Sequence, residues 1–121
     1  MPLAPKKKLR KDNRVELQLM VDYKCEDNFL FEYSSNLSQN GIFLLTQKPL
    51  SPGTRLELRF DIEDQSDAPY TIKVLGEVIW VNVLKTRKSS ADQVGMGIKF
   101  VNLDAVSKEK IRALVKRIAI L

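Results

Sequence analysis

Alternation of apolar and polar residues, repeated in short segments along most of the chain, constrains the fold more than any other feature of the sequence. In residues 15–23 (VELQLMVDY) nearly every second side chain is apolar, a period of two that is typical of a half-buried β-strand. Residues 54–62 (TRLELRFDI) repeat the pattern with charged residues on the polar side. Four further segments are predicted to be strands because they alternate or form short apolar runs: residues 29–33, 42–45, 71–83 and 94–101.

Turn-forming residues separate the six predicted strands. Residues 34–41 (SSNLSQNG) are predicted to form a polar turn, and Pro49, Pro52 and Gly53 interrupt pairing further on. Gly76 predicts a bulge or bend within the long fifth strand. Short antiparallel strands joined by such turns favour a closed sheet, because closure removes exposed edges. We therefore expect a mainly β protein, a six-stranded antiparallel β-barrel.

The period of the apolar residues changes near the end of the chain. From about residue 104 onward they recur at the 3.6-residue spacing of an amphipathic α-helix. Asp104 or Ser107 is suited to cap the start of this helix. The predicted apolar stripe consists of Ile111, Leu114, Val115 and Ile118, and it can extend to Leu121. We expect residues 15–121 to form the barrel together with this C-terminal helix.

The excess positive charge is confined to the first 14 residues. The chain has a formal net charge of +5, and residues 15–121 hold 14 basic and 14 acidic side chains. A protein that coats nucleic acid usually spreads its cations over a face. A basic arm over residues 1–14 instead indicates a local anionic target or a solubilising tail. The cations of this arm are Lys6, Lys7, Lys8, Arg10, Lys11 and Arg14.

Aromatic residues bear on the same question. Phe29, Phe31 and Tyr33 alternate and are predicted to face the core, and Trp80 is predicted to be in the core or half-buried. Small barrels that bind RNA or single-stranded DNA instead expose aromatic side chains as stacking platforms. With a formally neutral barrel, this pattern argues against a nucleic acid polymer as the partner.

Composition also disfavours an enzyme, a secreted protein and a membrane-spanning protein. The chain has no histidine, which is the commonest general base and metal ligand, and its single cysteine, Cys25, cannot form an internal disulfide. No apolar run is long enough to cross a bilayer, and the basic N-terminus lacks the apolar segment of a signal peptide. These features predict a cytoplasmic binding protein with no catalytic or metal site.

Two short motifs carry candidate binding groups. RKDNR places Arg10 and Arg14 four residues apart, and guanidinium groups suit phosphate oxygens and the acceptor edge of guanine. NLSQNG supplies the amide of Asn36, the hydroxyl of Ser38, and Gly41, which permits a positive φ or the close approach of a ligand to the backbone. Each motif alone also fits a plainer interpretation, because Asn, Ser and Gly are ordinary turn residues.

Together, the two motifs resemble the signature of the PilZ domain family, R-x-x-x-R followed by [D/N]-x-S-x-x-G. The resemblance continues in residues 41–58 (GIFLLTQKPLSPGTRLEL), in GEVIWV, and in GMGIKF before the final helix. It covers the chain from about Leu9 to the end. PilZ domains are six-stranded β-barrels with an accessory helix, and many bind the second messenger cyclic di-GMP.

The resemblance implies roles for particular residues. Arg10 and Arg14 would contact phosphate and guanine, Asn36 and Ser38 would contact a guanine edge, and Gly41 would shape the turn. In the family the N-terminal segment often folds over the ligand, and a residue other than arginine before the first motif arginine favours one ligand per chain. Here that residue is Leu9. Neighbouring candidates for ligand contact are Leu9, Lys11, Gln39 and Asn40.

Two functions are compatible with this resemblance. The first is a cyclic di-GMP receptor that relays binding to an unidentified downstream protein in motility, pilus or biofilm control. The alternative is an adaptor of the same fold that does not bind the nucleotide and acts by protein–protein contact. The motif has Asn36 where the signature also permits aspartate, a stronger acceptor for guanine N–H donors.

Overall fold

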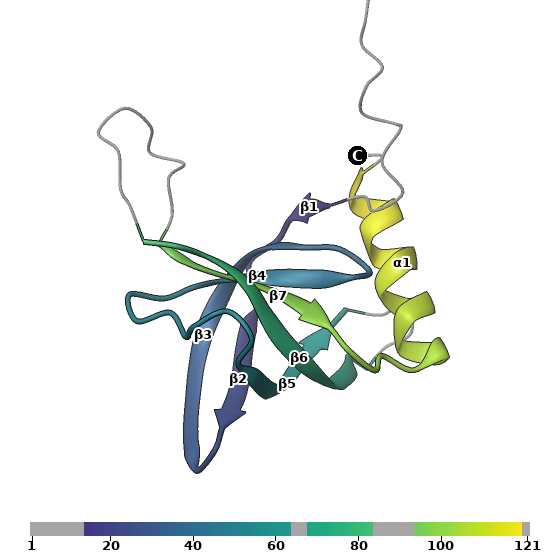
Figure 1. The fold of residues 1–121 in the computed structure, drawn as a ribbon. Helices are drawn as coiled ribbons and strands as arrows, with labels where there is room; N and C mark the ends of the chain where they lie inside the picture. Colours follow the sequence, from purple (N-terminus) through teal and green to yellow (C-terminus); the bar gives the residue numbers. More distant parts are fainter. Residues whose placement is uncertain (1–13, 64–67, 84–93, 120–121) are drawn as a thin grey trace, which may run out of the picture.

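Seven strands and one helix make up the part of the chain that the computed structural model describes, residues 14–63, 68–83 and 94–119 (Figure 1). The helix, α1, spans Ala105–Ala119. The strands are β1 (Val15–Glu16), β2 (Met20–Cys25), β3 (Asn28–Leu37), β4 (Gly41–Leu45), β5 (Arg55–Ile62), β6 (Tyr70–Asn82) and β7 (Gly95–Phe100).

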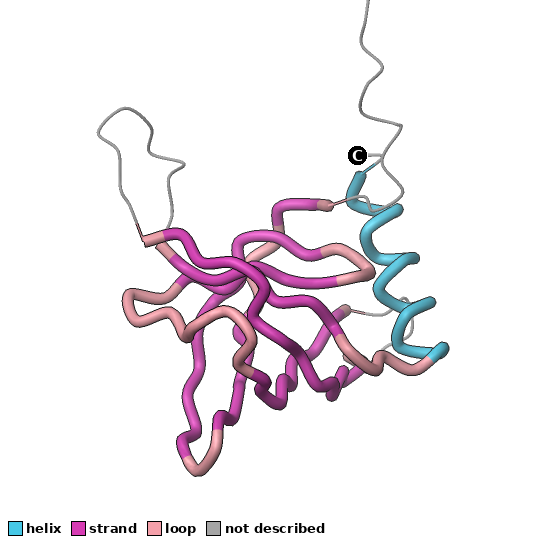
Figure 2. Tube along the Cα trace, viewed as in Figure 1, coloured by secondary structure: helices cyan, strands magenta, loops and turns pink. Residues whose placement is uncertain are grey.

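The strands form a closed antiparallel barrel. Their order in the sheet is β1-β3-β2-β5-β6-β7-β4, and an additional pairing between β3 and β4 closes the circle. Six strands, β2 to β7, therefore make the barrel that the alternation predicts, and β1 is an extra short strand on β3. Figure 2 shows the single helix lying beside the strands.

The core contains the residues that the sequence periods assign to it. Along β5 every second side chain is buried, and the buried ones are apolar. On α1 the side chains of Ile111, Leu114 and Val115 are buried, as the predicted stripe requires. Ile118 is half-buried, and Leu121 lies outside the described residues. The Asp104 side chain caps the helix by accepting a hydrogen bond from the Ser107 backbone N–H at 2.7 Å. In the described part of the chain, no helix has the length and apolarity needed to cross a membrane.

The first predicted strand is interrupted, which the sequence did not indicate. Between β1 and β2 the backbone turns around the side chain of Ser34, which is buried. The Ser34 hydroxyl donates to the Leu17 carbonyl at 2.6 Å and accepts from the Leu19 N–H at 2.9 Å. These two bonds replace the ladder bonds that the interruption removes, so both strands still pair with β3.

The polar segment after the second predicted strand is mostly strand and not turn. β3 continues to Leu37, and its final residues pair with β1 on one side and β4 on the other. The turn is confined to Ser38–Asn40. The prediction of a turn over residues 34–41 was therefore too long, because pairing on both edges outweighs the turn preference of Ser and Asn.

The orientation predicted for the β3 aromatic residues was wrong. Phe29, Phe31 and Tyr33 are 77%, 57% and 41% exposed. Each of the three is the cross-strand partner of an outward-facing residue of β2. The inward-facing Val21 of β2 pairs instead with Glu32, the residue between Phe31 and Tyr33. An alternating pattern fixes which side chains share a face, but pairing with the neighbouring strand decides which face is inside.

Gly76 does not mark the irregularity in β6. It lies in regular register with β5 and β7, and a side chain there would meet Ile98 and Leu58, so packing explains the glycine. The shift in register instead falls between Val78 and Trp80. The prediction of a bulge at Gly76 was therefore wrong, and the bulge that this strand does have lies further along it.

Candidate functional site

The pairing of β1 with β3 brings the two sequence motifs together. Glu16 is the cross-strand partner of Asn36, which places Arg14, just before β1, beside the end of β3. The Arg14 Nη1 donates a hydrogen bond to the Asn36 Oδ1 at 3.0 Å, across 22 residues of sequence. Arg14 is exposed and Asn36 is half-buried. The other three candidates of the N-terminal motif, Leu9, Arg10 and Lys11, lie outside the described residues.

Two β-bulges turn site residues outward. The register of β3 against β4 shifts between Ser34 and Asn36, so Asn36 points out of the barrel although Ser34, two residues earlier, points in. The register of β6 against β7 shifts between Val78 and Trp80, and this shift turns the Trp80 side chain outward. Bulges commonly re-aim a side chain beside a functional site.

Trp80 lies in the same transverse row as Asn36, and the sequence did not mark it as a site residue. The row runs through direct cross-strand partners, from Asn36 to Phe43, Gly97 and Trp80. The Trp80 and Phe43 rings stack above Gly97, with centroids 5.1 Å apart and an interplanar angle of 29°. A Cβ at Gly97 would lie 2.3 Å from the Trp80 Nε1, so the glycine makes room for the indole.

This stack presents an aromatic face to solvent. Phe43 is only 4% exposed because Trp80 covers it, whereas Trp80 is 49% exposed. The prediction that Trp80 lies in the core or is half-buried was wrong, because the shift in register turns its ring outward. No pattern in its own segment marks Trp80 as a site residue, because the glycine opposite it, Gly97, is known only from the register of β6 against β7.

Ser38 shapes the turn from within. Its side chain is 0% exposed. The Ser38 hydroxyl accepts hydrogen bonds from the backbone N–H groups of Asn40 and Gly41, both at 3.2 Å, and the Ser38 N–H bonds to the Gly41 carbonyl at 2.9 Å. In this arrangement the hydroxyl faces the backbone of its own turn, so its effect on the surface is indirect.

Gly41 is needed because two backbones approach closely. The φ of Gly41 does not lie in the left-handed region. Among the described glycines, only Gly53 has a φ in that region. A Cβ on Gly41 would lie 2.3 Å from the carbonyl oxygen of Ile98 in β7. The positive φ that the sequence suggested for Gly41 is wrong, and the close approach of a ligand stays a prediction. The close approach that the structure shows is that of β7.

The remaining two turn residues border the surface. Gln39 is half-buried and Asn40 is exposed. The Asn40 carbonyl accepts a hydrogen bond from the Phe100 N–H at 2.9 Å, which ties the turn to β7. The surface therefore combines a guanidinium group, a carboxamide and an open aromatic ring, groups that suit a flat ligand carrying negative charge.

Comparison with known proteins identifies the family. The family model of the PilZ domain matches residues 8–117. Among solved structures, the Bacillus subtilis inhibitor of motility (MotI/DgrA) superposes with a TM-score of 0.77 at 18% identity, over 98% of this chain and 57% of that one. The PilZ domain of YcgR from Escherichia coli, solved with c-di-GMP, gives 0.65 at 16% identity, over 92% and 94%.

The chain thus spans little more than half the length of the MotI/DgrA chain and nearly all of the YcgR PilZ domain. No curated protein matches the sequence. Both structural likenesses fall below 25% identity and establish the fold, while the family model covers most of the chain. On the strength of that match, this chain belongs to the PilZ domain family.

Proposed function

We propose that this PilZ domain binds cyclic di-GMP on the surface that carries Arg14, Asn36 and, beyond two intervening strands in the same row, Trp80, and that binding is relayed to a downstream protein. The observation that carries the proposal is the hydrogen bond from Arg14 to Asn36, which joins the two halves of the signature across 22 residues of sequence. PilZ domains are receptor and adaptor modules and not enzymes. The chemistry expected of this surface is therefore binding and not catalysis.

Each side chain has a role that its chemistry supports. Cyclic di-GMP carries two phosphates and two guanines. Arg14 would bind phosphate oxygens or the acceptor edge of guanine, because its planar donors match both. Asn36 would hydrogen-bond a guanine edge, and its position beside Arg14 also holds the guanidinium in place. The open face of Trp80 would stack on a guanine.

The N-terminal segment would complete the site. Arg10 stands four residues before Arg14 in the signature, and residues 1–14 carry the whole charge excess of the chain. We propose that this basic arm, with Lys11 near the ligand, folds over the bound nucleotide, and that the barrel of residues 15–121 serves as its base. Leu9 in the position before the first arginine favours one ligand per chain.

The turn residues would act through geometry. Ser38 holds the turn through bonds within it, Gly41 allows the turn to approach β7 closely, and Gln39 and Asn40 form its outer rim. A downstream protein would then recognise the altered position of the arm relative to the barrel. We propose that this receptor acts in motility, pilus or biofilm control.

Titration calorimetry with the full-length chain tests the function directly. We expect saturable binding of cyclic di-GMP at moderate salt, with one ligand per chain and a Kd on the order of 1 µM or tighter. GMP, which has one phosphate and one guanine, is the matched control and should bind at least about tenfold more weakly. A flat titration at concentrations up to about 1 mM would instead support the adaptor that does not bind nucleotide.

Replacement of Trp80 by alanine tests the stacking platform. Because stacking of one base on an aromatic ring contributes about 1–3 kcal/mol, Trp80→Ala is expected to weaken cyclic di-GMP binding by about tenfold to a hundredfold. Trp80→Phe should retain most of the affinity. Ile79→Ala, which truncates the equally exposed neighbour, is the control. Equal affinity of Trp80→Ala and the wild type would remove Trp80 from the site.

A further inference from the structure

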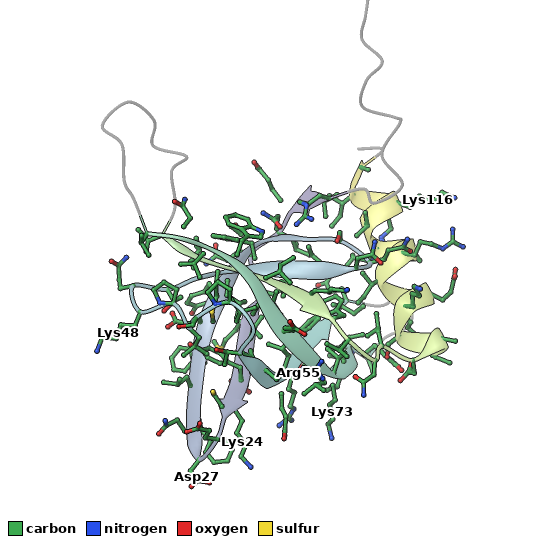
Figure 3. All side chains as sticks on the ribbon, in the orientation of Figure 1. Lys24, Asp27, Lys48, Arg55, Lys73 and Lys116 are labelled. Atoms are coloured by element: carbon green, nitrogen blue, oxygen red, sulfur yellow. The ribbon has the colours of Figure 1, made fainter. Side chains whose placement is uncertain are left out.

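A second exposed surface lies away from the candidate site. It is formed by the outward-facing side chains of β3, β2 and β5 near the β2–β3 hairpin, and we call it the hairpin face. Its residues are Phe29, Phe31, Asp22, Lys24, Glu57 and Arg59, and all six border one groove of about 660 Å³. Figure 3 places the labelled Lys24 at the hairpin end, far from Lys116 on α1.

The two phenylalanines are unusual for the surface of a monomer. Phe29 and Phe31 are more than half exposed and neighbour each other on one face of β3, with Tyr33 next along the strand. Exposed apolar side chains that cluster in this way mark an interaction surface more often than singly scattered ones. Phe29 is about seven residues from Asn36 along β3, roughly 23 Å at strand rise, so the ligand site does not account for this cluster.

The charges beside the phenylalanines form a fixed pattern. Register places Asp22 opposite Arg59 in one transverse row, and Lys24 opposite Glu57 in the next. The four charges therefore alternate in sign both along and across the strands. Within the described residues, none of the four takes part in an ion pair. Lys24 instead lies over the Phe29 ring, with its Nζ 5.3 Å from the centroid.

This pattern is complementary to itself. Consider a two-fold axis that lies in the plane of the face, runs perpendicular to the strands and passes midway between the two rows. Rotation about this axis places each row of one copy opposite the other row of the second copy. Asp22 then faces the second copy's Lys24, and Glu57 faces the second copy's Arg59. The same rotation sets Phe31 against the second copy's Phe29, because these residues belong to the same two rows. Self-complementarity of one patch is what an isologous dimer requires.

We propose that two copies of this chain associate through the hairpin face as a two-fold symmetric dimer. The paired charges of opposite sign fix the register, and the phenylalanines supply the apolar contact. A polyanion such as RNA suits the face less well, because Asp22 and Glu57 would repel its phosphates. A patch of this extent lies at the small end of stable interfaces, so the association should be weak and should depend on concentration and salt.

Sedimentation equilibrium of the full chain tests the dimer. From about 1 µM to about 1 mM, the weight-average mass of the wild type should rise from 13.8 kDa towards twice that value. Two charge-reversed variants make the test specific. Asp22→Lys with Glu57→Lys leaves only cations on the four positions, and Lys24→Glu with Arg59→Glu leaves only anions. Each variant alone should remain monomeric, and a one-to-one mixture should form a heterodimer.

Phe29→Ser is expected to weaken self-association by about tenfold or more, because exposed aromatic side chains are frequent anchors of interfaces. Val106→Ser, which removes an apolar side chain of 58% exposure from α1, should leave self-association unchanged. A wild type that stays at 13.8 kDa throughout would overturn the dimer and leave the face for another protein. Charge-reversed variants that self-associate like the wild type, or whose mixture stays monomeric, would overturn the proposed register.

The charge-reversed variants also separate this proposal from the proposed function. Their substitutions lie on β2 and β5, whereas Arg14, Asn36 and Trp80 lie before β1, on β3 and on β6. Cyclic di-GMP titrations of both variants should therefore match the wild type. Loss of the dimer with retained nucleotide binding is the expected result, and a protein that binds no nucleotide can still be tested for the dimer.

Discussion

Replacement of Arg14 by alanine is expected to weaken the binding of cyclic di-GMP by about a hundredfold or more. A hydrogen bond to a charged group contributes about 1.5–3 kcal/mol, and a guanidinium group can make two such bonds to a phosphate or to guanine. The substitution also removes the partner of Asn36, whose Oδ1 accepts the Arg14 bond at 3.0 Å. Titration calorimetry under the conditions used for the wild type measures the loss.

The control for this prediction removes one positive charge at a position away from the candidate site. Arg112 is an exposed arginine of α1 that bonds to Glu109 on the same helix, and Arg112→Ala should leave the affinity unchanged. Arg14→Lys preserves the charge but not the planar fork of donors, so it should recover only part of the affinity. Wild-type affinity in Arg14→Ala, with the fold intact by circular dichroism, would contradict the role of Arg14.

The barrel and its helix could be predicted because their residues follow a single period. In β5 every inward position is apolar and every outward position is polar or charged, so the sequence specifies both the strand and its buried face. The stripe on α1 and its cap at Asp104 are specified in the same way. Where the apolar period is regular and the polar residues all lie on the other face, the sequence is sufficient to predict both the element and its buried face.

In the β2–β3 hairpin, the alternation of residues does not predict which face of the strand is buried. Phe29 and Phe31 alternate with other residues as core side chains would, yet they lie outside because the pairing with β2 sets their face. Bulges add a second difficulty, because one extra residue reverses the inside and outside of everything after it. The shifts beside Asn36 and Trp80 both fall at positions where the sequence holds no glycine or proline.

The candidate site likewise has a part that could be predicted from the sequence and a part that could not. The meeting of Arg14 with Asn36 was expected from the resemblance of the two motifs to a family signature, and the structure shows the hydrogen bond between them. Trp80 could not be added from its own segment, because its place in the same row as Asn36 depends on register through two intervening strands, β4 and β7. Long-range register is a property of the closed barrel and not of any local pattern.

Substitution of Gly41 by alanine is expected to lower the free energy of unfolding by about 3 kcal/mol, or roughly 10 °C in Tm. The added Cβ would lie 2.3 Å from the Ile98 carbonyl oxygen and 3.3 Å from its carbon, and both atoms belong to the backbone. Neither can rotate away as a flexible side chain would, so β4 and β7 must separate locally. Urea denaturation followed by circular dichroism measures the change.

Gly53→Ala is the matched control, because it isolates the other reason for keeping a glycine. Gly53 has φ of +96°, but no atom lies within 4 Å of the place that a Cβ would occupy, so its substitution costs backbone strain without a clash, about 1–2 kcal/mol. If Gly53→Ala were the more destabilising of the two, the close approach of β4 and β7 would not explain Gly41. The Gly41 N–H also bonds to the Ser38 hydroxyl, so separation of the strands should loosen the turn beside Asn36. Gly41→Ala should therefore weaken nucleotide binding even where the chain remains folded, and Gly53→Ala should not.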